Sequence, residues 1–556
     1  MINNEQNNNE NGIIKFPNGI TLVKKNEPSK EFFINPNFHP TNVDGHYPAF
    51  LTPGASNLIN EDSREMSVIL ESFLPQLEKI GIELKDLNNL IREIILSTEV
   101  FRRLKGISQI ELLPFAFSKV PWFTRYTHSC LTYVFADYVI EKLNSNLNLN
   151  QLDLEASKLC FLIHDLGHGP FSHLTERAFR TPRGRNGKTP KEYDHEYWTK
   201  ILLNELRENL FDTFKNPYLP KNISSIPNKN LKKSKEYNLN IFSRALAIMS
   251  RNELPIISQL LSGQIDLDRL SNYLGDRLVV SEVLEEIDFK KEPAVKLLSS
   301  YNQTVENIKR IFHNFIITDI DLNGNKCNPY LAIHENAAKP VMHYLLDRHI
   351  IRYYLLKHPK REAANNLLHK ILRRAKELVM KKDLDSIGKT DLLMITWLYG
   401  NHTEAEFIAL NDQLLFNQMR KWAKYALDPL LRDLCLRFTA NAFFNVYSVE
   451  RNGEPFLPDE TFLDSLKNAV SKSLKIKGIS EELIRDYYFT YDETTSSPYH
   501  LNEEEIIIYT NDKKVKKLSD FINDTNDELG KVLLETKFER YLVVFPEIST
   551  LELPLP

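Results

Sequence analysis

The pair His164-Asp165 is the first feature of the sequence that could carry out chemistry. It follows a segment, 156–163, in which apolar residues recur at the three- and four-residue spacing of one buried helix face. Because His164 continues that face, we expect it to be buried beside the carboxylate of Asp165. A buried histidine next to a buried carboxylate must be hydrogen-bonded, ion-paired or bound to a metal.

Two other segments each contribute one candidate ligand. His128 lies three residues before Leu131, where an apolar stripe begins, so we expect it to point to the core from near a helix start. Asp268 lies in the run 264–270, whose two acids and arginine would be costly to bury without partners. Imidazoles together with carboxylates favour a divalent cation such as Mn, Fe, Mg, Co or Zn, which can activate water and offset charge on a phosphoryl oxygen. Taken alone, each of these residues is more often an ordinary core or surface residue, so the prediction depends on the set.

The elements expected around these residues are mainly helices. We divide the chain into a disordered Asn-rich tail at 1–12, an N-terminal hairpin and extended segment at 13–64, a helical domain at 65–360 and a helical then mixed α/β region at 361–556. The helical domain contains every candidate ligand.

Turn signals and composition locate the smaller elements. Apolar runs around Asn18-Gly19 predict one hairpin, and the segment 315–333 predicts another. The segment 213–240 is rich in Pro, Asn, Ser and Lys and predicts a surface loop. Gly167 is the expected stop of the helix that precedes it. After residue 360 we expect helices to about 480, then strands at 487–491, 506–510 and 541–545, with a helix at 517–536 between the last two.

The composition excludes several classes of protein. The formal net charge is −4, so charge alone supports neither nucleic acid nor a membrane surface as a partner, although nucleic acid stays open. No run of about 18 apolar residues is present, and the first residues lack the order of a signal peptide. The four cysteines lie far apart and are expected to be buried thiols. We therefore expect a cytoplasmic protein with no membrane partner.

The string from His164 to His173, HDLGHGPFSH, resembles the core of the HD-domain deoxynucleoside triphosphate triphosphohydrolases. It is most similar to the branch that also carries a sterile-alpha-motif domain, which has no counterpart here. The ligand order of that family is His, His-Asp, Asp, and His128 and Asp268 lie at matching distances on either side. The resemblance covers about 90–360 and returns faintly at 485–546. It implies a mainly α fold with an HD-domain helical core, small β-hairpins and a mixed α/β C-terminal region.

The resemblance also implies an activity, namely metal-dependent hydrolysis of (deoxy)nucleoside triphosphates to nucleoside and inorganic triphosphate. By position, it implies metal ligands at His128, His164, Asp165 and Asp268, triphosphate contacts at Arg125, Arg269 and Arg348, an acid/base and phosphate-facing group at His168, His173, Glu176 and His195, and sugar contacts at Gln109 and Asp276. Arg269 replaces a lysine of the family and keeps its charge. A protonated His168 or His173 would stabilise the leaving oxygen.

The sequence departs from the family in the pocket rather than at the ligands. Asn272 and Leu356 stand where the family has tyrosines that contact the nucleotide, so discrimination between dNTP and NTP is open. Ser97, Arg102 and Lys105 replace residues of a guanine-sensing activator site. We therefore expect no strict requirement for GTP.

Two other functions stay open on the sequence. One is an HD phosphohydrolase acting on a monophosphate, a cyclic nucleotide or an alarmone, which would need the metal ligands but not Arg125, Arg269 and Arg348 together. The other is a nucleotide- or nucleic-acid-binding regulator with a relict site, which intact buried charges disfavour. The expected partners are a nucleotide substrate and further copies of the chain in a homo-oligomer.

Overall fold

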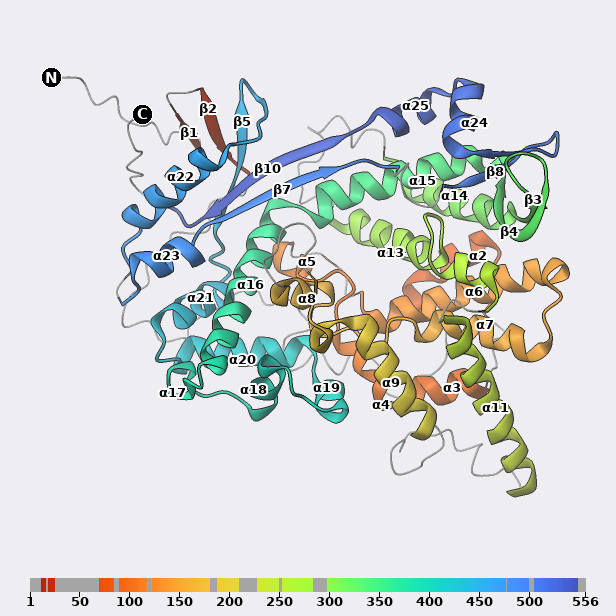
Figure 1. Cartoon of the computed structure of the whole chain (residues 1–556), viewed down its shortest axis with the longest axis horizontal. Helices are drawn as coiled ribbons and strands as arrows, with labels where there is room; N and C mark the ends of the chain where they lie inside the picture. Colours follow the sequence, from red (N-terminus) through yellow and green to blue (C-terminus); the bar gives the residue numbers. More distant parts are fainter. Residues whose placement is uncertain are drawn as a thin grey trace.

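The chain folds mainly into α-helices, with two small sheets (Figure 1). The computed structural model describes residues 12–16, 19–25, 70–84, 90–117, 120, 123–180, 188–209, 228–249, 253–283, 298–476, 478–499 and 505–548. The expected fold class is confirmed: a helical core, hairpins and a mixed α/β C-terminal region. None of the helices in these ranges is long and apolar enough to cross a lipid bilayer.

The candidate ligands lie on one group of helices near the middle of the chain. These helices are α6 (Arg125–Leu147), α7 (Gln151–Ile163), α8 (His173–Phe179), η7 (Lys191–Tyr193), α9 (His195–Asn209), α11 (Asn228–Met249), α12 (Pro255–Leu261) and α13 (Leu267–Val283). Helix α6 is buried on most of its circumference, since α7, α13 and η5 all pack on it. A helix that is apolar on several sides belongs in the centre of a domain, and α6 is that element here.

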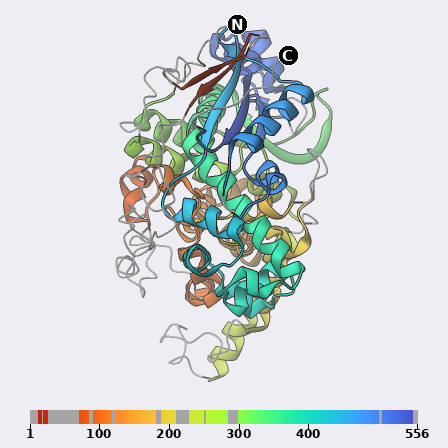
Figure 2. The same ribbon diagram turned by 90° about the vertical axis from the view of Figure 1, so that its left-hand side faces the viewer.

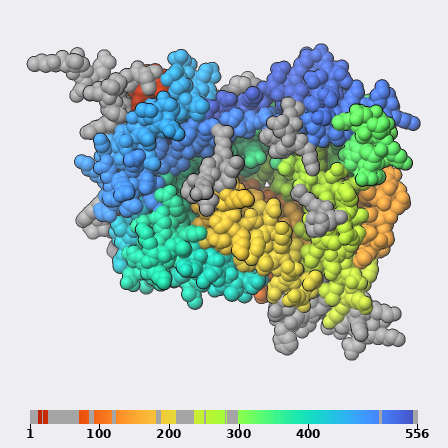
Figure 3. All heavy atoms as spheres, viewed as in Figure 1, coloured from red at the N-terminus to blue at the C-terminus, as the bar shows by residue number. Residues whose placement is uncertain are grey.

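The remaining helices surround this group. Those that precede it are η4 (Glu71–Phe73), α2 (Leu74–Ile80), α3 (Leu90–Ser97), α4 (Glu99–Arg102), η5 (Arg103–Gly106) and α5 (Leu113–Ala116). Those that follow it are α14 (Tyr301–His313), η10 (Glu335–Ala337), α15 (Ala338–Ile351), the π-helical turn η11 (Arg352–Leu356), α16 (Pro359–Met380), α17 (Leu384–Ile387), α18 (Leu392–Tyr399), α19 (Glu404–Ala409), α20 (Asp412–Tyr425), α21 (Pro429–Thr439), α22 (Glu460–Ser473), α23 (Glu481–Tyr487), α24 (Leu518–Thr525) and α25 (Glu528–Glu535). Viewed on one face, α8 and α9 (yellow) lie between the teal helices of α16–α21 and the yellow-green α11 (Figure 3).

A six-stranded antiparallel sheet joins the two ends of the described chain. It has the order β1-β2-β5-β10-β7, with β6 on β5, and consists of β1 (Ile13–Lys15), β2 (Ile20–Lys24), β5 (Asn445–Arg451), β6 (Glu454–Pro455), β7 (Thr490–Ser496) and β10 (Phe538–Phe545). The predicted hairpin at 13–23 is confirmed, with Ile14 opposite Leu22. It adds to the C-terminal sheet through β2 and β5, a long-range pairing that local sequence does not specify. Turned by 90°, the molecule has this sheet and α22 at one end and α11 at the other (Figure 2).

The second sheet has four strands in the order β3-β4-β8-β9. Its members are β3 (Phe315–Ile320), β4 (Lys326–His334), β8 (Ile507–Tyr509) and β9 (Val515–Lys517). The hairpin predicted at 315–333 is therefore confirmed as β3 and β4. β8 adds in parallel to β4 and links the C-terminal region to the helical core.

Three expectations about local structure are wrong. Residues 228–240, expected as loop, form the first part of α11. The segment 445–451, expected within a helical region, is β5. Helix α7 ends at Ile163 rather than at Gly167. Residues 1–11 of the predicted tail at 1–12, and residues 17–18 and 26–64 of the predicted N-terminal segment at 13–64, lie outside the described residues.

All four cysteines are free thiols as predicted, and three of the four are buried. Cys130, Cys160 and Cys435 are buried free thiols, and Cys327 is free and half-buried.

Candidate active site

Helix boundaries position the first group of candidate ligands. Arg125 is the first residue of α6, which places His128 one turn later on the same face. His164 is the C-cap of α7, so Asp165 follows directly where the chain leaves the helix. Asp268 lies in the first turn of α13. Three helix ends therefore converge on one point.

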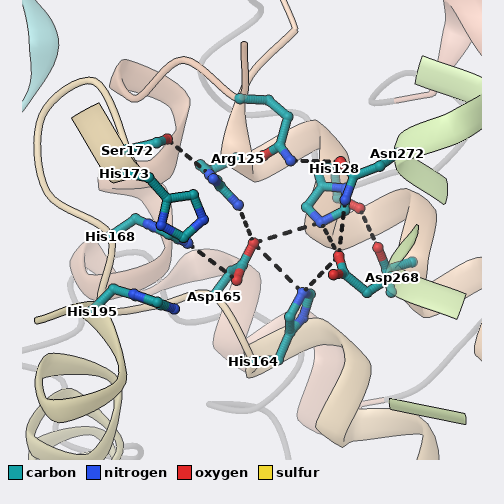
Figure 4. Close-up of polar contacts among 12 residues, drawn as sticks. Arg125, His128, His164, Asp165, His168, Ser172, His173, His195, Asp268 and Asn272 are labelled. Carbon is teal, nitrogen blue, oxygen red and sulfur yellow. Dashed lines mark hydrogen bonds and ion pairs between the residues drawn. The ribbon is translucent and has the colours of Figure 1, made fainter. Parts of the chain in front are cut away.

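The four side chains His128, His164, Asp165 and Asp268 come together as the sequence predicts (Figure 4). His128 Nε2 lies 2.8 Å from Asp268 Oδ1 and 3.5 Å from Asp165 Oδ2. His164 Nε2 lies 3.4 Å and 3.5 Å from the same two oxygens. One ligand atom from each residue lies within 4.8 Å of the others. We call this set the first ligand group.

Polar contacts behind the two histidines favour a proton on Nδ1. His164 donates from Nδ1 to the carbonyl of Phe161 at 2.9 Å. The hydroxyl of Ser271 lies 2.8 Å from the carbonyl oxygen of Asp268 and 3.3 Å from His128 Nδ1. When that hydroxyl donates to the carbonyl, His128 Nδ1 is the donor in the second contact. With the proton on Nδ1, each neutral imidazole has a lone pair on Nε2, which is the arrangement of a metal-binding histidine.

The first ligand group fits a divalent cation. The Nε2 atoms of His128 and His164 are buried and make no well-aligned hydrogen bond among the described residues. Both face carboxylate oxygens, and a lone pair facing a carboxylate is repelled unless positive charge lies between them. Two imidazoles and two carboxylates are also a suitable donor set for Mn, Fe, Co or Zn.

The electrostatics keep this group ionised. Burial alone would raise the pKa of Asp165, but His164 and Arg125 hold it well below its usual range. Burial would likewise raise the pKa of Asp268, and His128 and His164 hold it well below its usual range. Burial would lower the pKa of His164, but Asp165 and Asp268 raise it to about 9. The two carboxylates thus present negative charge that a cation would neutralise.

A second group of four lies directly beside the first. Helix α8 places His173 and Glu176 on one face, α9 begins at His195, and His168 lies in the loop before α8. The rings of His168 and His195 are stacked with centroids 4.4 Å apart, and Nδ1 of His195 lies 3.1 Å from Glu176 Oε1. Burial and Arg125 lower the pKa of His168 to about 4, which disfavours the expectation that His168 is a protonated acid.

The loop between α7 and α8 is held by residues far away in the sequence. Arg103 donates to the carbonyls of Leu166 at 3.3 Å and His168 at 2.5 Å. Gly167 donates its N–H to Thr199 Oγ1 on α9 at 2.9 Å. The loop therefore cannot move without disturbing both ligand groups.

The end of this loop is strained. Phe171 and Ser172 both have a φ of 54°, a backbone angle that residues with a Cβ seldom adopt. Asp412 accepts hydrogen bonds from the backbone N–H of Phe171 at 2.5 Å and of Ser108 at 2.8 Å. Ser172 Oγ accepts from Arg125 Nε at 2.9 Å. Strain of this kind persists only where the surroundings hold it, as they do at functional sites.

Gly167 gives a direct test of how tightly the loop is packed. A Cβ at this position would lie 2.0 Å from the carbonyl oxygen of His195 and 2.2 Å from the N of Thr199, both backbone atoms. We expect Gly167→Ala to lower the free energy of unfolding by ~2–3 kcal/mol, as overpacking does, and to displace α9 with His195. Denaturant unfolding measures the change.

Gly169→Ala is the matched control for this substitution. The nearest atom to its Cβ would be Thr175 Oγ1 at 3.6 Å, an ordinary contact. A Gly167→Ala variant as stable as Gly169→Ala would contradict the packing of the loop on α9.

Both ligand groups open into one cavity of about 700 Å³. The predicted residues that line it are Gln109, Arg125, Asp165, His168, His173, His195, Asp268, Asp276 and Arg348, and Asn272 and Leu356 line it too. Gln109 Nε2 donates to Asn272 Oδ1 at 2.6 Å, and Asn272 Nδ2 donates to Asp268 Oδ1 at 3.2 Å, so these residues form a chain from the cavity wall to the first ligand group.

Arg269 does not reach this cavity. Its Nε lies 3.3 Å from Asp266 Oδ2, and its side chain lines a smaller neighbouring cavity of about 30 Å³ with Arg348 and Arg352. Arg348 and Arg352 line both cavities. A direct role for Arg269 at the ligand groups is therefore less favoured by the geometry than the roles of Arg125 and Arg348.

Several residues of the cavity wall were not predicted. They are Ile110, Glu111, Arg177, Arg352, Lys357, Arg361, Glu362, Asn365, Asn366, His369, Thr490 and Asp492. Glu111 Oε2 accepts from Arg177 at 2.7 Å and from Arg361 at 2.5 Å, and Arg177 with Arg361 opposes burial to hold the pKa of Glu111 at about 2. The sequence signal for this wall is weak because its residues come from segments far apart.

Known proteins share both a domain and the fold with this chain. A family model described as the HD domain matches residues 125–255. The uncharacterised protein YwfO of Bacillus subtilis is 23% identical over 437 residues, which cover 76% of this chain and 82% of that protein. A deoxynucleoside triphosphate triphosphohydrolase SAMHD1 of Gallus gallus is 33% identical over 96 residues, covering 17% of this chain and 15% of that protein. The crystal structure of a phosphohydrolase from Bacteroides thetaiotaomicron has a TM-score of 0.60 and 21% identity, covering 83% of this chain and 96% of that one.

Proposed function

We propose that this chain, which contains an HD domain and has the fold of a known phosphohydrolase, hydrolyses deoxynucleoside triphosphates to nucleoside and inorganic triphosphate. The observation that carries the proposal is the junction of the first ligand group with a cavity lined by arginines. The short similarity to a vertebrate deoxynucleoside triphosphate triphosphohydrolase supports the choice of substrate.

Two arginines of the cavity are free to bind an anion. Arg125 is paired with Asp165, and Arg177 and Arg361 are paired with Glu111. Arg348 and Arg352 make no side-chain hydrogen bond or ion pair within the described part of the chain, although both line the cavity. Adjacent unpaired guanidinium groups favour a ligand with several negative charges, such as a triphosphate.

The proposed roles follow the position of each residue. His128, His164, Asp165 and Asp268 would hold a divalent cation, which would activate a water molecule and offset charge on a phosphoryl oxygen. Arg348, with Arg352, would hold the phosphate chain. His173, Glu176, His195 and His168 would face the leaving oxygen, and Gln109 with Asp276 would accept and donate hydrogen bonds at the sugar.

Product analysis tests the proposal. The purified chain is incubated with each dNTP and NTP in the presence of Mn, Mg, Fe or Co, and the phosphate products are separated by ion exchange. We expect inorganic triphosphate and nucleoside without added GTP. Release of orthophosphate or diphosphate, or hydrolysis of a monophosphate or cyclic nucleotide alone, would show a different phosphohydrolase. Nucleotide binding with no product would favour a regulator.

The carboxyl group of Asp276 predicts a pH dependence of substrate binding. Burial raises the pKa of Asp276 to about 7, against the lowering effect of Arg348 and Arg361. Above that pH the carboxylate accepts a charged hydrogen bond from a sugar hydroxyl, and below it the neutral group binds more weakly. We expect KM to rise ~5-fold from about pH 8 to about pH 6, because the two kinds of hydrogen bond differ by ~1 kcal/mol.

The Asp276→Asn variant provides the comparison, since it mimics the neutral group at every pH. Its KM should match that of the wild type at about pH 6 and exceed it at about pH 8. A ratio of the two KM values that does not change with pH would remove Asp276 from sugar binding.

The homo-oligomer, the cytoplasmic location and the domain boundaries at 64 and 360 stay predictions. The match to the HD domain lies inside the expected helical domain.

A further inference from the structure

We propose that His168, His173, Glu176 and His195 form a binding site for a second divalent cation. This set, the second ligand group, is separate in its residues from the first, and one ligand atom from each of its members lies within 4.8 Å of the others. The inference deepens the proposed function, on which its catalytic meaning rests, because His173 and His195 line the same cavity as the first group.

Buried polar atoms without hydrogen-bond partners indicate that the second ligand group is suited to bind positive charge. His168 is 1% exposed and Glu176 4% exposed, yet His168 Nδ1 and Glu176 Oε1 make no hydrogen bond among the described residues. The Nδ1 atom of His195, also buried, makes none either. Buried polar atoms normally have a partner, and three of them face one another here.

The tautomer of His168 strengthens this argument. Its Nε2 lies 3.3 Å from Asp165 Oδ1, an acceptor, so a proton on Nε2 serves that contact. The other nitrogen, Nδ1, then carries a lone pair 3.6 Å from Glu176 Oε1. A histidine that ligates a metal through one nitrogen and donates to a carboxylate through the other is a frequent arrangement in metal sites.

The spacing of the ligand atoms agrees with a shared ion. Ligands about 2.0–2.1 Å from a tetrahedral ion lie about 3.3 Å from one another. Oxygens of Glu176 lie 3.1 Å from His195 Nδ1, 3.3 Å from His173 Nδ1 and 3.6 Å from His168 Nδ1. Three imidazoles and one carboxylate are a donor set that suits Zn, Mn, Fe or Co better than Mg or Ca.

The alternative occupant of the second ligand group is a proton on one or more histidines. Three histidine donors around one carboxylate would be expected to align with its oxygens, but only His173 Nδ1 makes a hydrogen bond to Glu176, at 3.3 Å. The rings of His168 and His195 are instead stacked, with an interplanar angle of 6°, and both Nδ1 atoms lie near the same oxygen. His173 Nδ1 faces the other oxygen, Oε2, so two of the three imidazoles converge on Oε1. A cation bound at Oε1 accounts for this pair of buried Nδ1 atoms without a well-aligned hydrogen bond from either of them.

One imidazole ring, that of His168, separates the two ligand groups. One of its nitrogens contacts Asp165 (Figure 4), and the other lies 3.6 Å from Glu176 Oε1. A cation in the second group would therefore lie beside the phosphate chain of a substrate whose reacting phosphate is at the first group. It would supply the positive charge at the leaving oxygen that the second group is proposed to stabilise.

Metal stoichiometry tests the inference without relying on turnover. The full chain is stripped with a chelator and titrated with Mn²⁺ or Co²⁺, and bound metal is measured by calorimetry and by elemental analysis after gel filtration. We expect two ions per wild-type chain. Glu176→Gln, which keeps the shape of the side chain, and His195→Gln should each bind one, and Asp268→Ala should bind one. The variant with both Glu176→Gln and Asp268→Ala should bind none.

The control for charge removal is Glu78→Gln, at an exposed residue of α2, which should still bind two ions. Circular dichroism and thermal unfolding confirm that each variant is folded. One ion per wild-type chain, with Glu176→Gln and His195→Gln unchanged, would overturn the inference. Two bound ions without triphosphate release would instead overturn the proposed function and leave the second site intact, so the two failures are distinguishable.

Discussion

Asp268→Ala is expected to abolish hydrolysis and to remove the cation of the first ligand group. Its Oδ1 is the only carboxylate oxygen within 3 Å of His128 Nε2 in the described chain, at 2.8 Å, and it also lies 3.4 Å from His164 Nε2. Loss of a metal ion that offsets phosphoryl charge costs several kcal/mol in the transition state, so we expect kcat to fall by ~10³-fold or more. Steady-state hydrolysis of the preferred dNTP and the metal content measure both effects.

A thermal signature separates loss of metal from loss of fold. A ligand present at ~100 times its Kd stabilises a protein by ~2.7 kcal/mol, so adding the metal should raise the Tm of the wild type. The same addition should raise the Tm of Asp268→Ala less, because one site is gone. Wild-type hydrolysis by Asp268→Ala with metal bound would contradict the assignment of this ligand.

Asp266→Asn is the matched control, two residues earlier in the chain. Asp266 accepts from the backbone N–H of Gly263 at 2.9 Å and of Arg269 at 2.6 Å, so it holds the start of α13 rather than the ligand group. We expect this variant to lose ~1–2 kcal/mol of stability, as a lost cap does, and to retain its metal. Asp266→Asn should therefore lower stability and keep the metal, whereas Asp268→Ala should lose both the metal and hydrolysis.

The first ligand group could be predicted from the sequence because each ligand lies at a helix end with a strong apolar pattern. The three- and four-residue spacing of apolar residues in 156–163 predicts the buried helix face that His164 continues. The apolar stripe that begins at Leu131 likewise predicts the buried face of α6 on which His128 lies. Their convergence needs tertiary structure, and it was predicted from the resemblance rather than from periodicity. The structure brings the four residues together as that resemblance implied.

Direction within a helix explains why Arg269 lies away from the larger cavity. Arg269 follows Asp268 directly, and successive residues of a helix point about 100° apart. With Asp268 facing the ligand group, Arg269 faces Asp266 and the smaller cavity instead. Arg352 was missed for a related reason, since it lies in the π-helical turn η11, which helical periodicity does not describe.

Long-range pairing explains the errors in secondary structure. The segment of β5, NVYSVER, has four successive buried residues after Asn445, a pattern that a buried helix and a central strand share. It becomes a strand because β2 and β10 pair on either side of it.

The first part of α11 is polar and basic, so local composition predicted a loop, yet the helix packs on α7 through its later residues. Glu111 with Arg177 and Arg361 is likewise a contact across 66 and 250 residues that no local pattern indicates.

Replacement of Arg125 is expected to give the second largest effect, and one of a different kind from Asp268→Ala. Arg125 is 5% exposed, donates from Nη1 to Asp165 Oδ2 at 2.6 Å and from Nε to Ser172 Oγ at 2.9 Å. It thus joins the first ligand group to the strained end of the loop before α8. A lysine keeps the charge but cannot make both bonds at once, so we expect Arg125→Lys to lower kcat ~10²-fold while leaving measurable turnover.

Metal binding should respond to Arg125→Ala in the opposite direction to catalysis. Without metal, this variant leaves Asp165 as a buried carboxylate without its guanidinium partner, which costs ~3–5 kcal/mol of stability. A cation can take over the neutralisation of Asp165, and the repulsion between the guanidinium and the ion is gone. We therefore expect the metal to raise the Tm of Arg125→Ala by more than that of the wild type, and to bind at least as tightly, while kcat falls further than in Arg125→Lys.

Three proteins are compared: the wild type, Arg125→Lys and Arg125→Ala. For each we measure metal binding by calorimetry, thermal unfolding with and without metal, and dNTP hydrolysis. Arg310→Lys, an exposed arginine paired with Glu306 on α14, controls for the substitution itself and should change none of these quantities. An equal metal-induced rise in Tm for wild type and Arg125→Ala would show that the cation and the guanidinium do not share Asp165. Such a result would leave Arg125 as a substrate contact alone, because its link to Asp165 would then have no consequence for the metal.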